Sequence, residues 1–165
     1  MHESTTSAQA QTTDTSAKLL LVASSGGHLF ELLCVRELWA NREHSWVCFP
    51  TADAKVLLEG ERVTWAHYPT NRNLKNLIKN LWLAWTLLRK ERPDVVISTG
   101  AGVGVPFLLL ARLLGSKTVY LESITRITEL SLSGRLVYPF VSRFLVQWKE
   151  LAVRHAKAQY KGRIL

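Results

Sequence analysis

The first candidate site is a turn of small residues that directly follows the first apolar run of the chain. The turn reads SSGGH, and it lies between an expected strand at 19–23 and an expected helix at 29–40. Two glycines permit a tight turn and close backbone approach to a ligand, and free N–H groups at a helix start attract phosphate. The predicted phosphate-binding residues here are Ser24, Ser25, Gly26 and Gly27.

His28 ends this turn, and its imidazole can donate to a diphosphate or accept a proton from an attacking hydroxyl near neutral pH. We therefore predict it as a catalytic residue. In the alternative interpretation, Gly26 and Gly27 only form a turn and His28 only begins the helix.

A second glycine loop, TGAGVG at residues 99–104, also stands between an expected strand and an expected helix. Gly100, Gly102 and Gly104 are predicted to bind the same diphosphate. The loop also resembles a dinucleotide fingerprint, with Glu122 about 20 residues further along the chain. Val105 occupies the position of that fingerprint's last glycine, so nicotinamide or flavin binding is only an alternative. A second alternative is that these glycines only allow a helix to pack closely on the sheet.

Polar residues after the expected strand at 118–121 form a third group. Glu122 is a candidate general base or sugar-hydroxyl acceptor, and Arg126 a candidate phosphate ligand. These two residues can equally pair with each other at the surface. Because the carboxyl ends of parallel strands meet at one edge, all three groups are expected there. The five histidines show no metal-ligand spacing, so no metal site is predicted.

The elements that must position these groups alternate between short apolar runs and longer amphipathic ones, which predicts a single α/β, Rossmann-like domain with a mainly parallel sheet over residues 18–165. Residues 1–17 are rich in Ser, Thr and Gln and are expected to be a disordered polar arm. The expected strands are 19–23, 46–49, 63–67, 94–98, 118–121 and 144–148, and the expected helices are 29–40, 53–58, 73–91, 103–114, 133–142 and 150–158.

Charge divides the chain unevenly: residues 1–71 carry net −3 and residues 72–165 net +11. The basic half predicts an anionic partner, and charge alone does not choose among a phosphorylated ligand, nucleic acid and an acidic membrane. Tryptophans amid basic residues on the 73–91 helix favour a membrane surface over nucleic acid, although aromatic residues at helical spacing are also common in cores. No apolar run reaches the ~18 residues of a spanning helix. The predicted membrane contacts are Lys75, Lys79, Trp82, Trp85 and Arg89.

The order LLLVASSGGH, long helix, PDVVISTGAGVGVPFLLLARLLG, TVYLES and FLVQW resembles the N-terminal half of GT-B glycosyltransferases that act on polyprenyl-diphosphate lipids. The enzyme that adds GlcNAc to the peptidoglycan lipid precursor is one of these. The chain is more similar to split members, namely the accessory subunit of the eukaryotic dolichol-linked UDP-GlcNAc transferase and bacterial PssD-type capsule and exopolysaccharide proteins. The resemblance covers about residues 18–165. The first loop has fewer glycines than that of the intact enzyme, and a polar arm replaces the eukaryotic anchor.

This resemblance implies a subunit of a hexosyl- or N-acetylglucosaminyltransferase that is inactive alone and peripheral on the cytoplasmic face of a membrane. A separate small catalytic subunit would hold the UDP-sugar, and this chain a polyprenyl-diphosphate-linked acceptor, without metal or cofactor. The length agrees, because a GT-B enzyme needs two domains and this chain ends after one. Tyr160, Ile164 and Leu165 are expected to contact the partner. A non-catalytic membrane adaptor and an NAD(P)-binding oxidoreductase are the alternatives.

Overall fold

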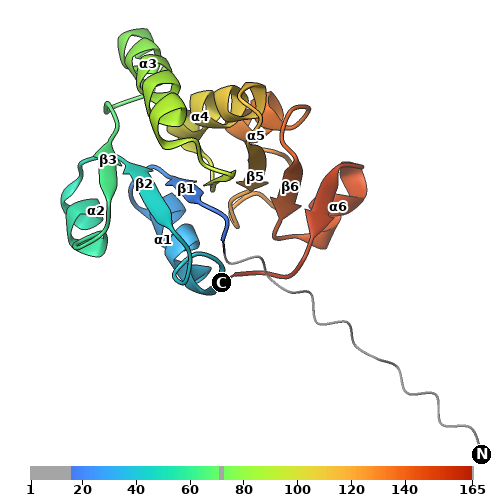
Figure 1. Cartoon of the computed structure of the whole chain (residues 1–165). Helices are drawn as coiled ribbons and strands as arrows, with labels where there is room; N and C mark the ends of the chain where they lie inside the picture. The colour runs from blue at the N-terminus through green and yellow to red at the C-terminus, as the bar shows by residue number, and fades with distance from the viewer. Residues whose placement is uncertain (1–15, 71–72, 165) are drawn as a thin grey trace, which may run out of the picture.

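A seven-stranded sheet, in which every neighbouring pair of strands is parallel, forms the centre of the protein (Figure 1). The computed structural model describes residues 16–70 and 73–164, so nearly all of the predicted polar arm lies outside the described residues. The strand order is β3-β2-β1-β4-β5-β6-β7. The strands are β1 (Leu19–Val22), β2 (His44–Cys48), β3 (Val63–Trp65), β4 (Val95–Ser98), β5 (Lys117–Leu121), β6 (Arg143–Val146) and β7 (Ala158–Tyr160).

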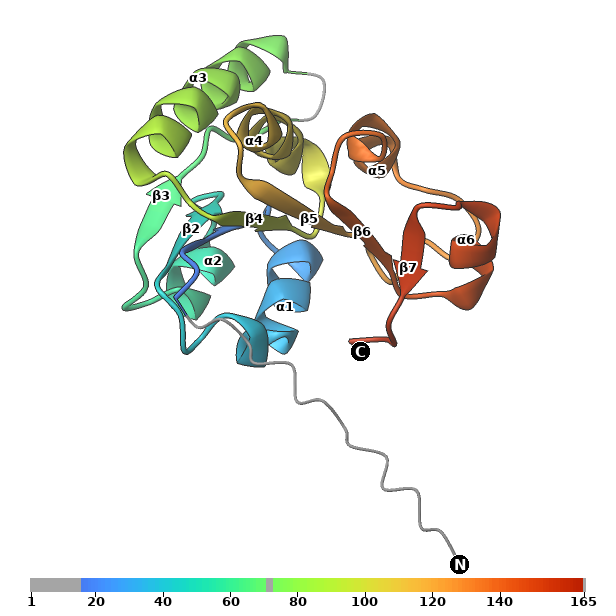
Figure 2. The same ribbon diagram turned by 45° about the vertical axis from the view of Figure 1, so that its right-hand side comes forward.

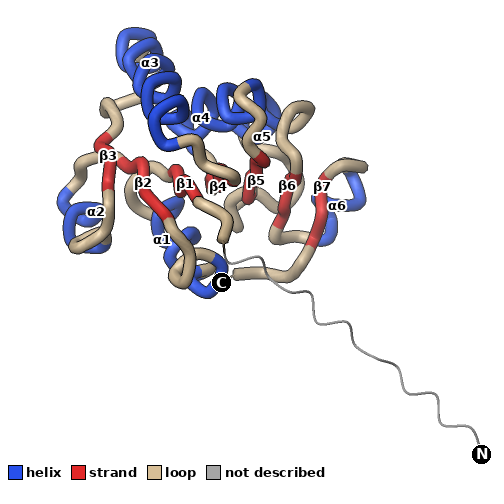
Figure 3. Tube along the Cα trace, in the orientation of Figure 1, coloured by secondary structure: helices blue, strands red, loops and turns tan. Residues whose placement is uncertain are grey.

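Helices cover both faces of the sheet, as the turned view and the tube trace show (Figures 2 and 3). One face carries α3, α4 and α5, and the other carries α1 and α2. This arrangement confirms the predicted Rossmann-like α/β domain. The helices are α1 (Gly27–Cys34), the 3-10 helix η1 (Arg36–Leu38), α2 (Ala52–Leu57), α3 (Leu74–Glu91), α4 (Ala101–Leu113), α5 (Leu132–Val137) and α6 (Lys149–Arg154).

Strand β1 is apolar throughout because both of its faces are buried. In β1, Leu20 and Val22 point into the core beneath α3 and α4, where Phe107 is also buried. Leu19 and Leu21 point into a second core with α1 and α2. The alternation of side chains along β1 thus joins the two helical layers to one sheet.

The largest departures from the predicted elements lie at helix ends and at the C-terminus. The first helix already begins at Gly27 and ends at Cys34, with η1 following it. The final helix ends at Arg154, and the chain then adds β7 along β6. A three-residue edge strand relies on backbone hydrogen bonds to β6, so its sequence needs no alternating pattern that would have predicted it.

An ion-pair network joins the start of β1 to the end of α3. Lys18 Nζ lies 2.8 Å from Glu91 Oε2 and 3.3 Å from Glu43 Oε1. The hydrogen bond that Lys18 donates to Glu91 holds the pKa of Glu91 below its usual range, and the same bond raises the pKa of Lys18. The network therefore ties two elements that are distant in sequence.

Glu91→Gln is expected to lower the free energy of unfolding by about 1 kcal/mol at pH 7 because it leaves Lys18 with a weaker partner. A carboxyl group whose pKa is lower in the folded state stabilises the fold at pH values above its unfolded pKa. The difference in free energy of unfolding between wild type and variant should therefore shrink as pH falls through the glutamate titration range. Urea unfolding at pH 7 and pH 4 measures both effects. The control Glu129→Gln removes an exposed pair with Arg135 and should change little; equal losses would contradict the assignment.

Candidate functional site

The two glycine loops meet where the order of strands reverses. β1 and β4 are neighbours, although β2 and β3 separate them in sequence, so their carboxyl ends form the topological switch point at which such sheets bind ligands. Thr99 Oγ1 donates to the carbonyl oxygen of His28 at 2.7 Å. The structure thus brings the SSGGH and TGAGVG loops together as predicted.

Glycine at position 100 is required by its backbone and by its neighbours. Its φ of 112° lies in the left-handed region. A Cβ there would stand 2.9 Å from the Tyr120 hydroxyl oxygen and 3.3 Å from His28 Cε1. Gly26 also has a positive φ, 68°, but opens onto free space. Gly100 therefore lets the second loop pass close to the imidazole of His28.

The helices that begin at this junction lack side-chain caps. Gly26 precedes α1 and Gly100 precedes α4, and neither supplies a capping hydrogen bond from a side chain. By contrast, Asn73 caps α3 and Ser131 caps α5. The first N–H groups of α1 and α4 are thus not satisfied by cap side chains, which is the arrangement that binds an anion at a helix start.

An unpredicted carboxylate shares this edge. The Gly26 N–H donates to Asp53 Oδ2 at 3.0 Å, and Asp53 is exposed in the first turn of α2. Because this N–H is occupied by a negative group, an anion is better placed toward Gly27 and the start of α4. The position of Asp53 after β2, the strand beside β1, is the sequence signal that could have found it.

His28 sits at the junction with one nitrogen buried and the rest of its ring partly open. Its side chain is 32% exposed, while Nδ1 is buried without a hydrogen-bond partner. Nε2, unlike Nδ1, is not among the buried unpaired atoms of the described residues, which agrees with an opening at that edge of the ring. The structure therefore allows the contact with a bound hydroxyl group that was predicted for this histidine.

Glu122 requires a correction, because it is only 1% exposed. Its Oε2 accepts from the backbone N–H and the hydroxyl of Ser131 at 3.0 and 3.1 Å, and its Oε1 accepts from the Ser123 N–H at 3.2 Å. Its Oε1 also accepts from the Tyr120 hydroxyl at 3.5 Å, so the carboxylate is occupied in holding Tyr120 and the 123–131 loop. These contacts support a structural role for Glu122, and the described part of the chain shows no ion pair between it and the exposed Arg126.

The glycines and serines of the two loops differ in how far they are open to solvent. Gly27 is exposed, Gly102 is half-buried, and a Cβ on Gly102 would touch Thr70 Oγ1 at 3.4 Å. Ser25 is half-buried, whereas Ser24 is buried and donates to the Ser25 carbonyl. Gly104 requires a correction: it is buried, and a Cβ there would collide with Ser98 Oγ on β4. It packs α4 against the sheet, as the alternative interpretation held.

Gly104→Ala is expected to destabilise the fold by about 1–3 kcal/mol, because the added methyl group overpacks the contact between α4 and β4. Thermal unfolding followed by circular dichroism measures this loss. Gly27→Ala is the matched control, since nothing lies within 4 Å of a Cβ there. A destabilisation as large in the control would contradict the packing role of Gly104.

The predicted membrane residues divide into two groups. Trp82 is 69% exposed, and it continues an exposed apolar stripe along α3; Lys75 and Lys79 are exposed on the same helix. Trp85 is half-buried and is covered by the Arg89 guanidinium, whose Cζ lies 5.1 Å from the ring centroid. None of the described helices combines the length and apolarity that a membrane span needs. The stripe consists of Leu74, Leu77, Ile78, Leu81 and Trp82.

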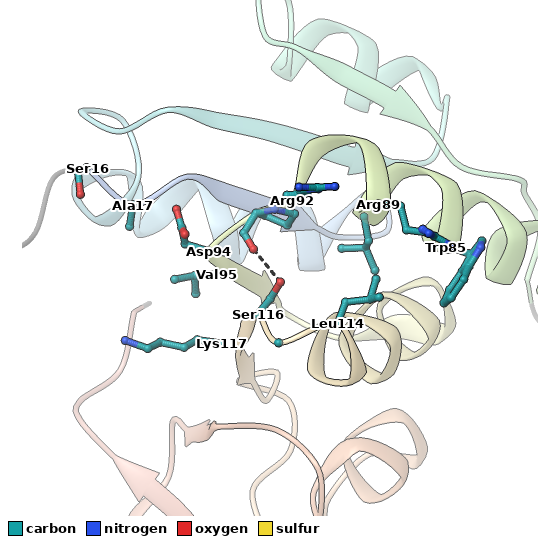
Figure 4. A pocket seen from close by; sticks show the side chains of 13 residues that line it. Ser16, Ala17, Trp85, Arg89, Arg92, Asp94, Val95, Leu114, Ser116 and Lys117 are labelled. Atoms are coloured by element: carbon teal, nitrogen blue, oxygen red, sulfur yellow. Dashed lines mark hydrogen bonds between the residues drawn. The ribbon is translucent and has the colours of Figure 1, made fainter.

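Trp85 and Arg89 instead line a cavity of about 860 Å³, seen from close by in Figure 4. Arg92 and Lys117 add positive charge to its wall, and Ser116 donates to the Pro93 carbonyl oxygen. The cavity lies at the segments that lead into β4 and β5. It is therefore at the amino edge of the sheet, opposite the glycine loops.

The C-terminal segment lies on the face of the sheet that carries α1. Tyr160 ends β7 half-buried, and Ile164 lines an apolar groove of about 390 Å³ under β4, β5 and β6. The Ile164 N–H donates to Gln147 Oε1 at 3.2 Å. Leu165, the third predicted partner contact, lies outside the described residues.

Comparison with known proteins decides the family. Residues 61–164 match the family model described as oligosaccharide biosynthesis protein Alg14 like. The chain belongs to this family. UDP-N-acetylglucosamine transferase subunit ALG14 of Mus musculus is 29% identical over 182 residues, covering 91% of this chain and 84% of that protein. The same-named subunit of Debaryomyces hansenii is 35% identical over 109 residues, covering 62% of this chain and 45% of its own.

Solved structures share the fold of this Alg14-like chain. MurG of Acinetobacter baumannii superposes with a TM-score of 0.65 at 18% identity, covering 79% of this chain and 41% of that one. UDP-GlcNAc 2-epimerase of Methanocaldococcus jannaschii, solved with UDP-GlcNAc and UDP, gives 0.70 at 16% identity, covering 88% and 46%. The chain thus spans less than half the length of these proteins. These superpositions confirm the predicted fold, a single Rossmann-like domain of the GT-B type.

Proposed function

We propose that the chain is the acceptor-binding subunit of a two-subunit glycosyltransferase that transfers GlcNAc from UDP-GlcNAc to a polyprenyl-diphosphate-linked acceptor. The observation that carries this proposal is the meeting of two uncapped helix starts beside His28. Relatives named as UDP-N-acetylglucosamine transferase subunits support the donor sugar. The product is a lipid-linked oligosaccharide, and capsule or exopolysaccharide precursors would need the same acceptor chemistry.

In the proposed site, the acceptor diphosphate lies against the first N–H groups of α1 and α4, near Gly27 and Gly102. Both helix starts carry partial positive charge, and Arg126 on the neighbouring loop adds a full one. His28 Nε2 faces the acceptor hydroxyl group. The partner subunit holds UDP-GlcNAc and stabilises the charge on the departing UDP, so this chain supplies no metal or cofactor site.

The lipid chain of the acceptor requires the subunit to work at a bilayer surface, on the cytoplasmic face. The exposed apolar stripe of α3 supports this, because a helix that packs on one sheet needs apolar residues only on the side that faces the sheet. Ile78 is 59% and Trp82 69% exposed, with Lys75 and Lys79 beside them. Apolar side chains flanked by lysines suit an anionic headgroup region.

The catalytic subunit is proposed to dock beside the C-terminal segment. The groove under β4, β5 and β6 leaves Val95, Ile97 and Val119 incompletely covered, and Ile164 forms part of its wall. Apolar surface of this kind is typical of obligate interfaces. Tyr160 begins the same segment, and the proposal extends to Leu165, which lies outside the described residues.

Binding of a short-chain polyprenyl-diphosphate-GlcNAc analogue to the full chain tests the acceptor site. Gly27→Asp should weaken binding at least tenfold, since it places a negative charge where the diphosphate is proposed to lie. Ala156→Asp adds the same charge in an exposed turn at the opposite sheet edge and should leave affinity unchanged. Lack of binding by the wild-type chain would contradict the proposal and favour an adaptor without substrate contact; tight binding of NAD(P) would favour the oxidoreductase reading.

A further inference from the structure

A buried carboxylate lies one helical turn after His28. Glu31 is 2% exposed, and its Oε1 accepts hydrogen bonds from the Ile124 N–H at 2.9 Å, the Ser123 hydroxyl at 3.1 Å and the Gln147 side-chain amide at 3.3 Å. Its Oε2 is buried without a hydrogen-bond partner. Three donors thus fix one oxygen of this carboxylate, while the other oxygen accepts no hydrogen bond.

The unoccupied oxygen lies next to the unpaired nitrogen of His28. Oε2 of Glu31 and Nδ1 of His28 are 3.8 Å apart, and both are buried without another partner. A buried polar atom without a hydrogen-bond partner is unfavourable, so two adjacent ones favour a small side-chain movement that joins them. No lysine or arginine pairs with Glu31 among residues 16–70 and 73–164, so His28 is its ionic neighbour there.

We propose that Glu31 is the positioning residue of His28. Its Oε2 accepts a hydrogen bond from Nδ1–H, which leaves the lone pair of neutral His28 on Nε2, at the exposed ring edge. A carboxylate held by three donors on its other oxygen keeps the imidazole in one orientation. This assignment rests on the proposed function and adds to it the group that selects the reactive nitrogen.

In the transfer step, the acceptor hydroxyl oxygen forms a bond to C1 of the sugar. The bond from C1 to the UDP oxygen breaks, and UDP leaves with that electron pair. The hydroxyl proton passes to Nε2 of His28. The resulting imidazolium keeps its Nδ1–H on Glu31, whose negative charge stabilises it without taking the proton.

The tautomer of His28, read from imidazole 15N chemical shifts of the full chain above pH 8, tests the proposal independently of activity. The wild type should carry its proton on Nδ1, with the signal assigned by its absence in His28→Gln. In Glu31→Gln, Oε1 still accepts its three hydrogen bonds, but the new amide donates to Nδ1. The proton should therefore move to Nε2.

Glu61→Gln is the matched control, since Glu61 pairs with the Nε2 of His44 at 2.9 Å far from the loops. It should leave the His28 signal unchanged. With the complete two-subunit enzyme, Glu31→Gln should lower kcat at least tenfold and change the acceptor KM little, whereas Glu61→Gln should change neither.

A wild-type His28 protonated on Nε2, or a tautomer unaffected by Glu31→Gln, would overturn the proposal whether or not the enzyme is active. The wild-type measurement decides this even if the variant fails to fold. A wild-type Nδ1–H tautomer that responds to Glu31→Gln, in a complex without transferase activity, would support the pairing and contradict the proposed function instead.

Discussion

His28→Gln should lower kcat of the two-subunit enzyme by about 10²–10⁴-fold, the usual contribution of a positioned general base. The glutamine keeps a polar side chain of similar length beside Gly100 but cannot take the hydroxyl proton. The acceptor KM should change little, because the proposed diphosphate contacts come mainly from backbone N–H groups. Steady-state kinetics with varied acceptor concentration separate the two parameters.

His67→Gln is the control for this prediction. His67 is exposed after β3 at the same sheet edge, and its backbone N–H and carbonyl are held by Asn80. Its variant should retain wild-type kcat. Full activity of His28→Gln would show that His28 only begins α1, as the alternative interpretation of the sequence has it.

Replacing Ile78 and Trp82 together by aspartate should lower the binding of the chain to phosphatidylglycerol-containing vesicles by at least about 100-fold. Each side chain contributes about 1.5–3 kcal/mol when it leaves water, and 1.4 kcal/mol corresponds to a factor of ten in binding. Aspartate also repels the anionic surface, which the neighbouring Lys75 and Lys79 attract. Vesicle sedimentation measures the bound fraction.

The matched control replaces Val56 and Leu57 by aspartate on α2, which covers the opposite face of the sheet. These side chains are also exposed and apolar, so the charge and hydrophobicity changes are similar. Vesicle binding should remain at the wild-type level. If both double variants lost binding equally, the α3 stripe would not be the membrane contact.

Most of the fold was predictable because the buried strands can be recognised in the sequence. LLLV in β1 is a continuous apolar run and VVIS in β4 is apolar up to its last residue, as is typical of strands that crossover helices bury on both faces. The end of α3 was predictable as well, because Pro93 follows it and the residue before a proline disfavours helix. β7 was missed, because three residues at a sheet edge carry no distinguishing pattern.

The glycine loops of the site were predictable for a related reason: each follows an apolar strand, and the topology forces their meeting. The roles of the acidic residues near the site could not be predicted in this way. Glu122 comes directly after β5 and looks available, but Ser131, nine residues later, folds back onto it. Glu31 was missed because it lies about 100° or more around the helix from the buried Leu29 and Leu32, so helical spacing does not place it in the core. Ser123, Ile124 and Gln147 cover it, and all three are distant in sequence.

The most direct measurement of the central claim is GlcNAc transfer from UDP-GlcNAc to a polyprenyl-diphosphate-linked acceptor, comparing this chain alone, the small catalytic subunit alone and their mixture. We predict product only from the mixture, because the two substrates are proposed to lie on different chains. Transfer by this chain alone would contradict the two-subunit account, as it would mean that one domain holds both donor and acceptor.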